Sequence, residues 1–167
     1  MQPAAPPGSP SAFPPVSPPV SVVIPAHDRA PTIVAAIASV LRQTAADFEL
    51  IVVDDGSSDG TAEAAETVTD PRLRVVRLPE NRGAAGARNA GVAEARGRWI
   101  AFQDSDDEWL PEKLARQLAR LAARPEAIAV YCGMLTVGGL SEEREGQRTR
   151  VTYIPDPGIG LVEGRIQ

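Results

Sequence analysis

The 167-residue sequence has one cysteine, one lysine and no long apolar run. A single cysteine, Cys132, excludes an internal disulfide, and its apolar neighbours predict a buried side chain in a reducing compartment. No stretch approaches the roughly 18 apolar residues that a membrane-spanning helix needs. The N-terminus has neither the basic region nor the apolar core of a signal peptide. We therefore expect a cytoplasmic protein.

Positive charge is also scarce. The formal net charge is −5, and Lys113 is the only lysine among the basic residues. A broad nucleic-acid-binding surface requires clustered lysine and arginine side chains. The composition therefore predicts that nucleic acid is not a partner.

The first 19 residues consist mainly of proline, alanine and serine. Such a segment cannot bury enough apolar area to offset the entropy of ordering it. We expect a disordered tail over residues 1–19 and one domain over residues 20–167, a length sufficient for a hydrophobic core.

Apolar runs and helical periodicities alternate along this domain. Strands are predicted at 20–25, 48–53, 73–78, 98–102 and 127–137, with Pro25 ending the first of them. Helices are predicted at 31–44, after a cap at Ser57 or Ser58, at 84–96, and from Pro111 onward. The first helix would bury Ile33, Val34, Ile37, Val40 and Leu41, and the last would align Leu114, Leu118 and Leu121. Residues 141–150 read as a solvated loop and 151–155 as its return strand, whereas 155–167 show no periodicity. The alternation predicts an α/β fold with a mostly parallel sheet and helices on both faces.

Polar side chains follow three of the predicted strands. The three groups are Pro25-Ala26-His27-Asp28, Asp54-Asp55-Gly56 and Asp104-Ser105-Asp106-Asp107. In parallel sheets ligands bind outside the carboxyl ends of the strands. The sequence therefore predicts one binding site at this edge.

Carboxylates gathered at one edge must repel, take up protons or hold a cation. Mg²⁺ or Mn²⁺ accounts for them best, because Mg²⁺ is usually held by one or two carboxylates together with substrate phosphates. In an extended backbone, Asp104 and Asp106 would point to the same side. Asp107 and Glu108 have an alternative role as helix-capping residues, since a helix N-terminus favours anions.

Two common phosphate-binding motifs are missing from the sequence. No Walker A motif occurs, and no G-x-G-x-x-G follows the first strand. The stretch Gly83–Gly91 has other spacing, although Arg82 and Arg88 within it have the reach to contact a diphosphate. Gly86 and Gly91 serve either close approach to a ligand or tight packing of a helix on the sheet.

Three segments together resemble the family-two glycosyltransferases. They are VSVVIPAHDRAPTIVAAIASVLRQT, FELIVVDDGSSDGT and ENRGAAGARNAGVAEARGRWIAFQDSDDEWLPEKL, within residues 20–135. The resemblance implies a Rossmann-like GT-A fold. It also implies inverting transfer from a nucleoside-diphosphate-sugar, with UDP-sugar favoured, and a metal-binding D-x-D motif.

The resemblance assigns roles to individual residues. Pro25, His27 and Asp28 would line the base pocket, and Asp54 or Asp55 would accept a hydrogen bond from the base, with Asp55 favoured. Arg88 would lie near the nucleotide or its phosphates. Asp104 would lie near the ribose or sugar, Ser105 beside it, and Asp106 would coordinate the metal, with Asp104 as a second ligand.

The family's catalytic base, a carboxylate in a later acidic motif, has no clear counterpart. The segment 137–143 has a similar glycine-rich approach but lies too close to Asp106, and Asp156 and Glu163 have no supporting context. We expect an incomplete acceptor-binding half. The leading interpretation is a metal-assisted glycosyltransferase acting on an unidentified glycan, lipid or protein, with peripheral attachment at the inner face of the membrane left open. The alternatives are a nucleotide-sugar-binding module without turnover and a sugar nucleotidyltransferase; a basic glycine-rich loop after the first strand, which the latter requires, is missing.

Overall fold

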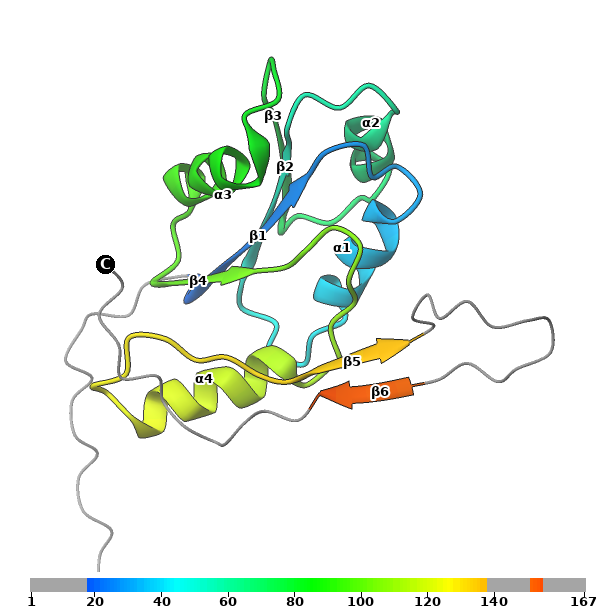
Figure 1. Cartoon of the computed structure of the whole chain (residues 1–167). Helices are drawn as coiled ribbons and strands as arrows, with labels where there is room; N and C mark the ends of the chain where they lie inside the picture. Colours follow the sequence, from blue (N-terminus) through cyan, green and yellow to red (C-terminus); the bar gives the residue numbers. More distant parts are fainter. Residues whose placement is uncertain (1–17, 138–150, 155–167) are drawn as a thin grey trace, which may run out of the picture. The chain divides into compact units, whose positions relative to one another are not determined.

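A computed structural model describes residues 18–137 and 151–154, which form two compact units divided between Lys113 and Leu114. The first unit contains, in chain order, β1 (Val20–Ala26), α1 (Ile33–Leu41), β2 (Glu49–Asp54), α2 (Thr61–Glu66), β3 (Leu73–Arg77), α3 (Gly83–Glu94) and β4 (Trp99–Phe102), as Figure 1 shows. Helix α4 (Lys113–Ala123) begins at Lys113, the last residue of the first unit, and continues into the second unit. The second unit continues with β5 (Met134–Val137) and β6 (Val151–Ile154).

The first unit is built on a parallel four-stranded sheet with the order β3-β2-β1-β4. The chain adds β2 and β3 on one side of β1 and then returns to place β4 on the other side. The order therefore reverses between β1 and β4, and this switch point is where open α/β sheets bind ligands. Every residue of β1 is buried, as expected for a central parallel strand.

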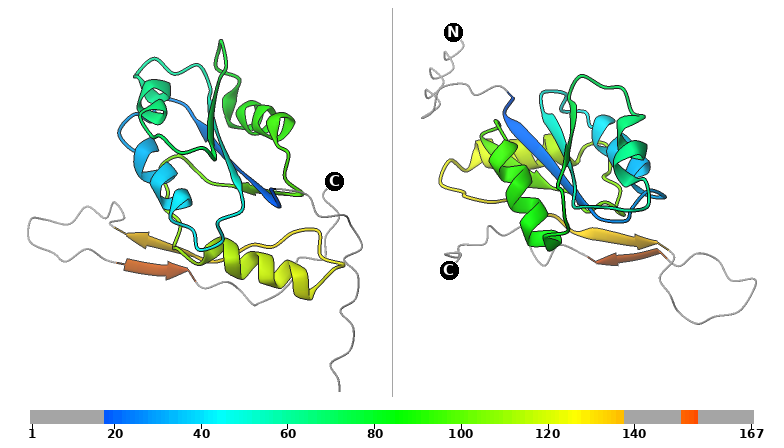
Figure 2. Two further views of the ribbon diagram at one scale, coloured as in Figure 1. Left: turned by 180° about the vertical axis from the view of Figure 1, so that it is seen from behind. Right: turned by 90° about the horizontal axis from the view of Figure 1, so that it is seen from above.

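Helices cover both faces of this sheet, as predicted. Helix α3 packs against β1 and β2, and Val23, Ile51, Val53 and Ala87 form the buried cluster between them. A Cβ atom at Gly91 would collide with the side chain of Val23, so this glycine serves close packing of helix on sheet. Helices α1 and α2 lie against the opposite face (Figure 2).

The prediction that Pro25 ends the first strand was wrong. Strand β1 continues to Ala26, and Pro25 pairs with Val53 of β2. Proline is tolerated because its missing N–H faces the β4 side, where pairing has already ended at Val23. The separation of β1 from β4 beyond this point opens the sheet edge.

Two further details of the first unit differ from expectation. Val34 is 41% exposed, because the buried stripe of α1 runs through Ile33, Ala36, Ile37 and Val40 at helical spacing and leaves Val34 beside it. Neither predicted serine caps α2. Its N-cap is Gly60, and Asp59 accepts the hydrogen bond from the backbone N–H of Thr61.

The second unit confirms the return strand but shortens the predicted fifth strand. Strand β5 covers only the last four residues of the predicted range 127–137, and it pairs antiparallel with β6. Cys132 precedes β5 and is exposed, so the prediction of a buried cysteine was wrong. An apolar run is buried only where another element covers it, and residues 127–133 join neither sheet.

Helix α4 buries Leu114 and Leu121 from its predicted apolar face. The predictions for the N-terminal tail up to residue 17, the loop 141–150 and the segment 155–167 concern residues outside those described. No helix in residues 18–137 has both the length and the apolar character of a membrane-spanning segment.

Candidate functional site

A cleft of about 290 Å³ opens at the carboxyl edge of the first unit's sheet. It lies where β1 and β4 separate, beside the N-terminal turns of α3. Its lining residues are Pro25, Ala26, His27, Arg29, Asp55, Asn81, Gly83, Ala84, Ala87, Arg88, Asp104, Ser105 and Asp106. Residues from all three predicted strand ends therefore meet in one cleft.

His27 follows β1 and ties it to the end of β2. Its Nδ1 atom lies 2.9 Å from the backbone carbonyl oxygen of Asp55. A carbonyl oxygen only accepts hydrogen bonds, so Nδ1 carries the proton in this arrangement. The other ring nitrogen, Nε2, lies 3.6 Å from Oδ2 of Asp28.

Asp28 is directed toward the loop between β2 and α2 and is not among the residues lining the cleft. Its backbone φ of 50° is left-handed, a conformation that aspartate tolerates better than most residues. The Asp28 N–H donates to Oγ of Ser57 over 3.0 Å, and the N–H of Ser58 donates to Oδ1 of Asp28 over 2.9 Å. These bonds fix the loop that carries His27.

Asp59 adds a second connection between the same two loops. Its Oδ2 accepts from the backbone N–H of Ala30 over 3.0 Å, and its Oδ1 accepts from the backbone N–H and the hydroxyl of Thr61. The Thr61 hydroxyl oxygen also accepts from the backbone N–H of Arg29 over 2.7 Å. Hydrogen bonds from Thr61 and then Ala30 lower the pKa of Asp59. Arg29 is thereby held at the rim of the cleft.

Of the two consecutive aspartates after β2, Asp55 lines the cleft and Asp54 does not. Asp55 is 2% exposed, and its Oδ1 accepts from the backbone N–H of Arg82 over 2.8 Å. Asp54 is also buried, and its Oδ1 has no hydrogen-bond partner among the described residues. The geometry therefore favours Asp55 over Asp54 as the ligand-facing residue.

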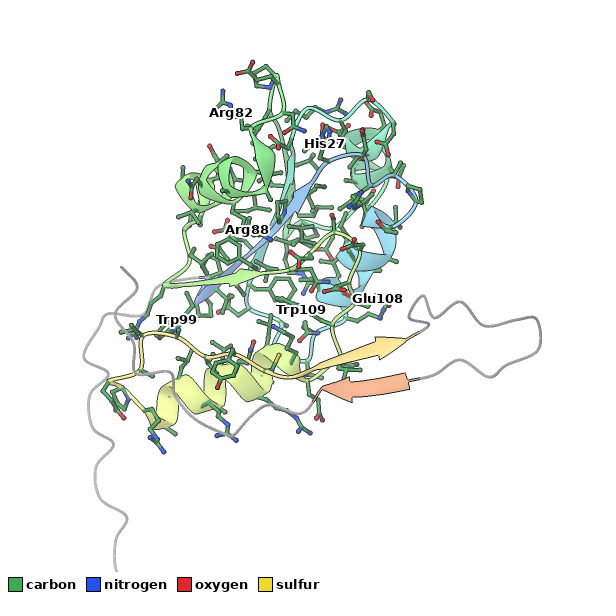
Figure 3. All side chains as sticks on the ribbon, in the orientation of Figure 1. His27, Arg82, Arg88, Trp99, Glu108 and Trp109 are labelled. Carbon is green, nitrogen blue, oxygen red and sulfur yellow. The ribbon has the colours of Figure 1, made fainter. Side chains whose placement is uncertain are left out.

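The loop before α3 approaches the end of β2 very closely. Gly56 has a φ of +67°, and a Cβ atom there would lie 2.7 Å from the backbone carbonyl carbon of Glu80. The approach brings the Arg82 N–H to Asp55 and places Asn81 on the cleft wall. The side chain of Arg82 is exposed and does not line the cleft, unlike that of Arg88 (Figure 3).

The acidic segment after β4 turns instead of remaining extended. The N–H of Asp107 donates to the carbonyl oxygen of Asp104, so the extended backbone in which Asp104 and Asp106 would point to the same side is not formed. Both side chains nevertheless line the cleft, and each faces an arginine. Arg88 Nη2 lies 2.8 Å from Oδ1 of Asp104, and Arg29 Nε lies 3.7 Å from Oδ2 of Asp106.

Asp107 and Glu108 are not capping residues of α4, which begins only at Lys113. Partial burial, together with the nearby carboxylates of Asp104 and Asp106, raises the pKa of Asp107. Glu108 pairs with Arg42 over 3.4 Å outside the cleft. Asp107 thus belongs to the same crowded group of acids but does not line the cleft.

Gln103 fixes the start of this acidic turn. Its side chain is 1% exposed, and its Nε2 donates to the backbone carbonyl oxygen of Asp107 over 2.5 Å. Its backbone N–H extends the pairing of β4 by donating to Val23. Buried Ser105, which also lines the cleft, lies inside the turn.

Among the described residues, no three histidine, cysteine, aspartate or glutamate side chains are grouped so that they alone would hold a metal. The cleft offers two carboxylates, Asp104 and Asp106, within one turn. Two carboxylates completed by phosphate oxygens are the usual donor set for Mg²⁺. The residues present therefore fit a metal that binds together with a diphosphate.

The structure brings seven of the nine predicted site residues to the cleft. They are Pro25, His27, Asp55, Arg88, Asp104, Ser105 and Asp106, whereas Asp28 and Asp54 do not line it. Their roles as ligand contacts stay predictions. Sequence reasoning missed Arg29 and Asn81. The only signal for Arg29 was its place directly after the PAHD segment.

Comparisons with known proteins converge on one family. Residues 21–162 match glycosyl transferase family 2. The succinoglycan biosynthesis protein ExoO of Rhizobium meliloti is 48% identical over 108 residues, which cover 65% of this chain and 31% of that protein. The Escherichia coli protein WfgD, named as a UDP-Glc:alpha-D-GlcNAc-diphosphoundecaprenol beta-1,3-glucosyltransferase, is 44% identical over 101 residues, covering 60% and 40% of the two chains.

Solved structures show the same similarity. S. aureus TarS 1-349 in complex with UDP-GlcNAc superposes with a TM-score of 0.60 at 30% identity, over 64% of this chain and 32% of that chain. The mannosyltransferase PcManGT of Pyrobaculum calidifontis, in complex with GDP-Man and Mn²⁺, gives a TM-score of 0.58 at 32% identity, over 64% and 34% of the chains. The predicted α/β fold of GT-A type is thereby confirmed. This chain spans about a third to two fifths of the length of these proteins.

Proposed function

The chain belongs to glycosyl transferase family 2, and from that premise we propose that its cleft binds the nucleoside-diphosphate-sugar donor of a sugar transfer reaction. The observation that carries the proposal is the meeting of three strand ends in one cleft at the switch point of the sheet. Ligands of open α/β sheets bind at this position. Structures that resemble the chain contain UDP-GlcNAc and GDP-Man.

We assign the nucleotide base of the donor to the side of the cleft formed by the ends of β1 and β2. Pro25 and His27 would form its wall, and Asp55 would accept a hydrogen bond from the base. Asp28 and Asp54 would support this wall from behind, Asp28 by holding the loop that carries His27. UDP is the favoured nucleotide, because it occurs in the TarS complex and in the name of WfgD.

The diphosphate would lie between α3 and the acidic turn. Arg88 offers a guanidinium group suited to a phosphate, and Gly83 and Ala84 place the N-terminus of a 12-residue helix at the cleft. Asp104 and Asp106 would hold Mg²⁺ or Mn²⁺, which neutralises negative charge on the diphosphate as it leaves. Ser105 lies between them, and Asp104 is also placed to reach the ribose or sugar.

Transfer would follow an inverting course, in which an acceptor hydroxyl attacks the anomeric carbon from the face opposite the diphosphate. A carboxylate base would take the proton of that hydroxyl. Asp156 and Glu163, the remaining sequence candidates, lie outside the described residues. We propose an acceptor on a glycan or lipid carrier, consistent with the names of ExoO and WfgD, and a cytoplasmic protein attached peripherally at the membrane.

A second candidate function is donor binding without turnover by this chain alone. The favouring observation is that each cleft-lining carboxylate in the described residues already has a partner. Asp55 accepts from Arg82, Asp104 pairs with Arg88 and Asp106 pairs with Arg29. The two candidate functions share the donor site and differ in whether a catalytic base reaches it.

Thermal unfolding with a panel of UDP, GDP and TDP, each with and without Mn²⁺, tests the shared proposal. A ligand at 100 times its Kd should stabilise the fold by about 2.7 kcal/mol. We expect one diphosphate to raise the melting temperature in Mn²⁺ and to do so less in EDTA. A panel without any metal-dependent shift would refute the donor site. Release of free nucleotide from a UDP-sugar on addition of acceptor then separates turnover from binding.

A further inference from the structure

The two acids proposed to hold the metal both pair with arginines in the cleft. Asp104 pairs with Arg88 of α3, and Asp106 pairs with Arg29 of the loop after β1. The side chains of both pairs are between 36% and 57% exposed. Ion pairs at such exposure are weak and exchange readily.

Two hydrogen bonds hold Arg29 at the rim of the cleft, beside Asp106. Its backbone N–H is bound by the Thr61 hydroxyl, and its Nη1 donates to the carbonyl oxygen of Asp28 over 3.1 Å. Its Nε faces Asp106 across the cleft rim. The loop therefore presents a positive group to the acidic turn.

Resting on the proposed function, we propose that Arg29 is a diphosphate-binding residue that occupies Asp106 until donor and metal arrive together. A guanidinium group binds phosphate oxygens as well as it binds a carboxylate. When the diphosphate enters, Arg29 moves from the Asp106 carboxylate to the phosphates. Asp106 is then free for the metal, and Arg88 makes the corresponding exchange from Asp104.

The consequence is thermodynamic coupling between metal and nucleotide. A metal that binds without diphosphate must displace two arginines that gain no new partner. A metal that binds with diphosphate displaces arginines that have phosphate oxygens to contact. The protein should therefore bind Mn²⁺ weakly alone and more tightly with nucleotide. By linkage, Mn²⁺ should raise the affinity for the nucleotide by the same factor.

The test measures Mn²⁺ binding by electron paramagnetic resonance and calorimetry, alone and with saturating UDP or GDP. The variants are Arg29→Gln, Arg29→Lys and the control Arg42→Gln, which breaks the Arg42–Glu108 pair outside the cleft. The backbone bond from residue 29 to Thr61 survives each substitution, and ligand-free melting temperatures verify folding. In Arg29→Gln, Mn²⁺ alone should bind more tightly, and the coupling factor should fall by up to about fivefold, the most that one exposed ion pair contributes. Arg29→Lys should keep more of the coupling, and Arg42→Gln should keep all of it.

An unchanged coupling factor in Arg29→Gln, or weaker binding of Mn²⁺ alone, overturns the role of Arg29 while leaving the donor site standing. A parent protein that binds neither UDP nor GDP in Mn²⁺ refutes the donor site as well. The same measurement with UMP, which has one phosphate fewer than UDP, tests which phosphate Arg29 contacts. Because the metal itself also binds the phosphates, UMP should couple to Mn²⁺ less than UDP in both proteins, and the difference between parent and Arg29→Gln should be smaller with UMP than with UDP.

Discussion

His27 at the end of β1 donates a hydrogen bond from Nδ1 to the backbone carbonyl oxygen of Asp55 at the end of β2, over 2.9 Å. The bond joins the two strand ends that form one wall of the cleft. The other ring nitrogen, Nε2, lies on the side of Asp28. The histidine thus has a defined positioning role whether or not it contacts a ligand.

His27→Ala should lower both stability and nucleotide affinity. Loss of one hydrogen bond of this kind costs about 1 kcal/mol. His27→Asn is the matched variant, because an asparagine amide can donate from nearly the same position as Nδ1. Urea unfolding and calorimetric titration with UDP should show a deficit in the alanine variant that asparagine largely restores. If both variants bind UDP like the parent, the wall does not depend on this bond.

Gly56→Ala should disrupt the wall formed by the loop before α3. The φ of +67° is strained for alanine, and the new Cβ would meet the Glu80 backbone, which cannot move as a flexible side chain would. Gly60→Ala is the control, because its φ of +90° imposes strain but no atom lies within 4 Å of the new Cβ. We expect about 1 kcal/mol of destabilisation at Gly60 and more than that at Gly56. Equal losses at both positions would show that the close approach to Glu80 is unimportant.

Asp107→Asn should stabilise the ligand-free protein at neutral pH. The pKa of Asp107 is raised by partial burial and by the carboxylates of Asp104 and Asp106. Its ionised form is therefore less favourable in the folded state than in the unfolded state, and this penalty operates above the raised pKa. As the pH falls below the ordinary aspartate value of about 3.9, Asp107 is protonated in both states and the penalty disappears.

Melting temperatures of the parent and Asp107→Asn across this pH range test whether the substitution stabilises or destabilises the protein. The variant should melt higher at neutral pH, and the difference should shrink toward zero in acid. A variant that melts lower at neutral pH would show that the Asp107 carboxylate makes a stabilising contact.

The placement of the cleft was predictable because a parallel sheet brings the carboxyl ends of its strands to one edge. That rule needs only the strands and the polar residues after them, and it brought His27, Asp55 and Asp104 together correctly. It does not fix the path of the chain beyond the strand. The turn at Asp104 was therefore not predicted, and the first strand was predicted to end at Pro25, one residue too early.

Contacts between loops were not predictable from local pattern. Arg29 reaches the cleft rim because its backbone N–H donates to Thr61 and that of the next residue, Ala30, donates to Asp59, both about thirty residues later. Asn81 lines the wall because Gly56 admits the Glu80 backbone. The exposure of Cys132 was misjudged for a related reason, since apolar neighbours in sequence do not reveal which element covers them.

Calorimetric titration of UDP in Mn²⁺ into the parent and Asp106→Asn tests the central claim, that the acidic turn closes a metal–diphosphate site. Asn keeps the volume of Asp106 but is a neutral and weaker ligand for a hard cation. Asp107→Asn is the control, because Asp107 lies in the same turn but does not line the cleft. The account predicts that Asp106→Asn loses the Mn²⁺-dependent part of UDP binding with a ligand-free melting temperature near that of the parent. Asp107→Asn should keep that binding. Parent-like binding of UDP in Mn²⁺ by Asp106→Asn would contradict it.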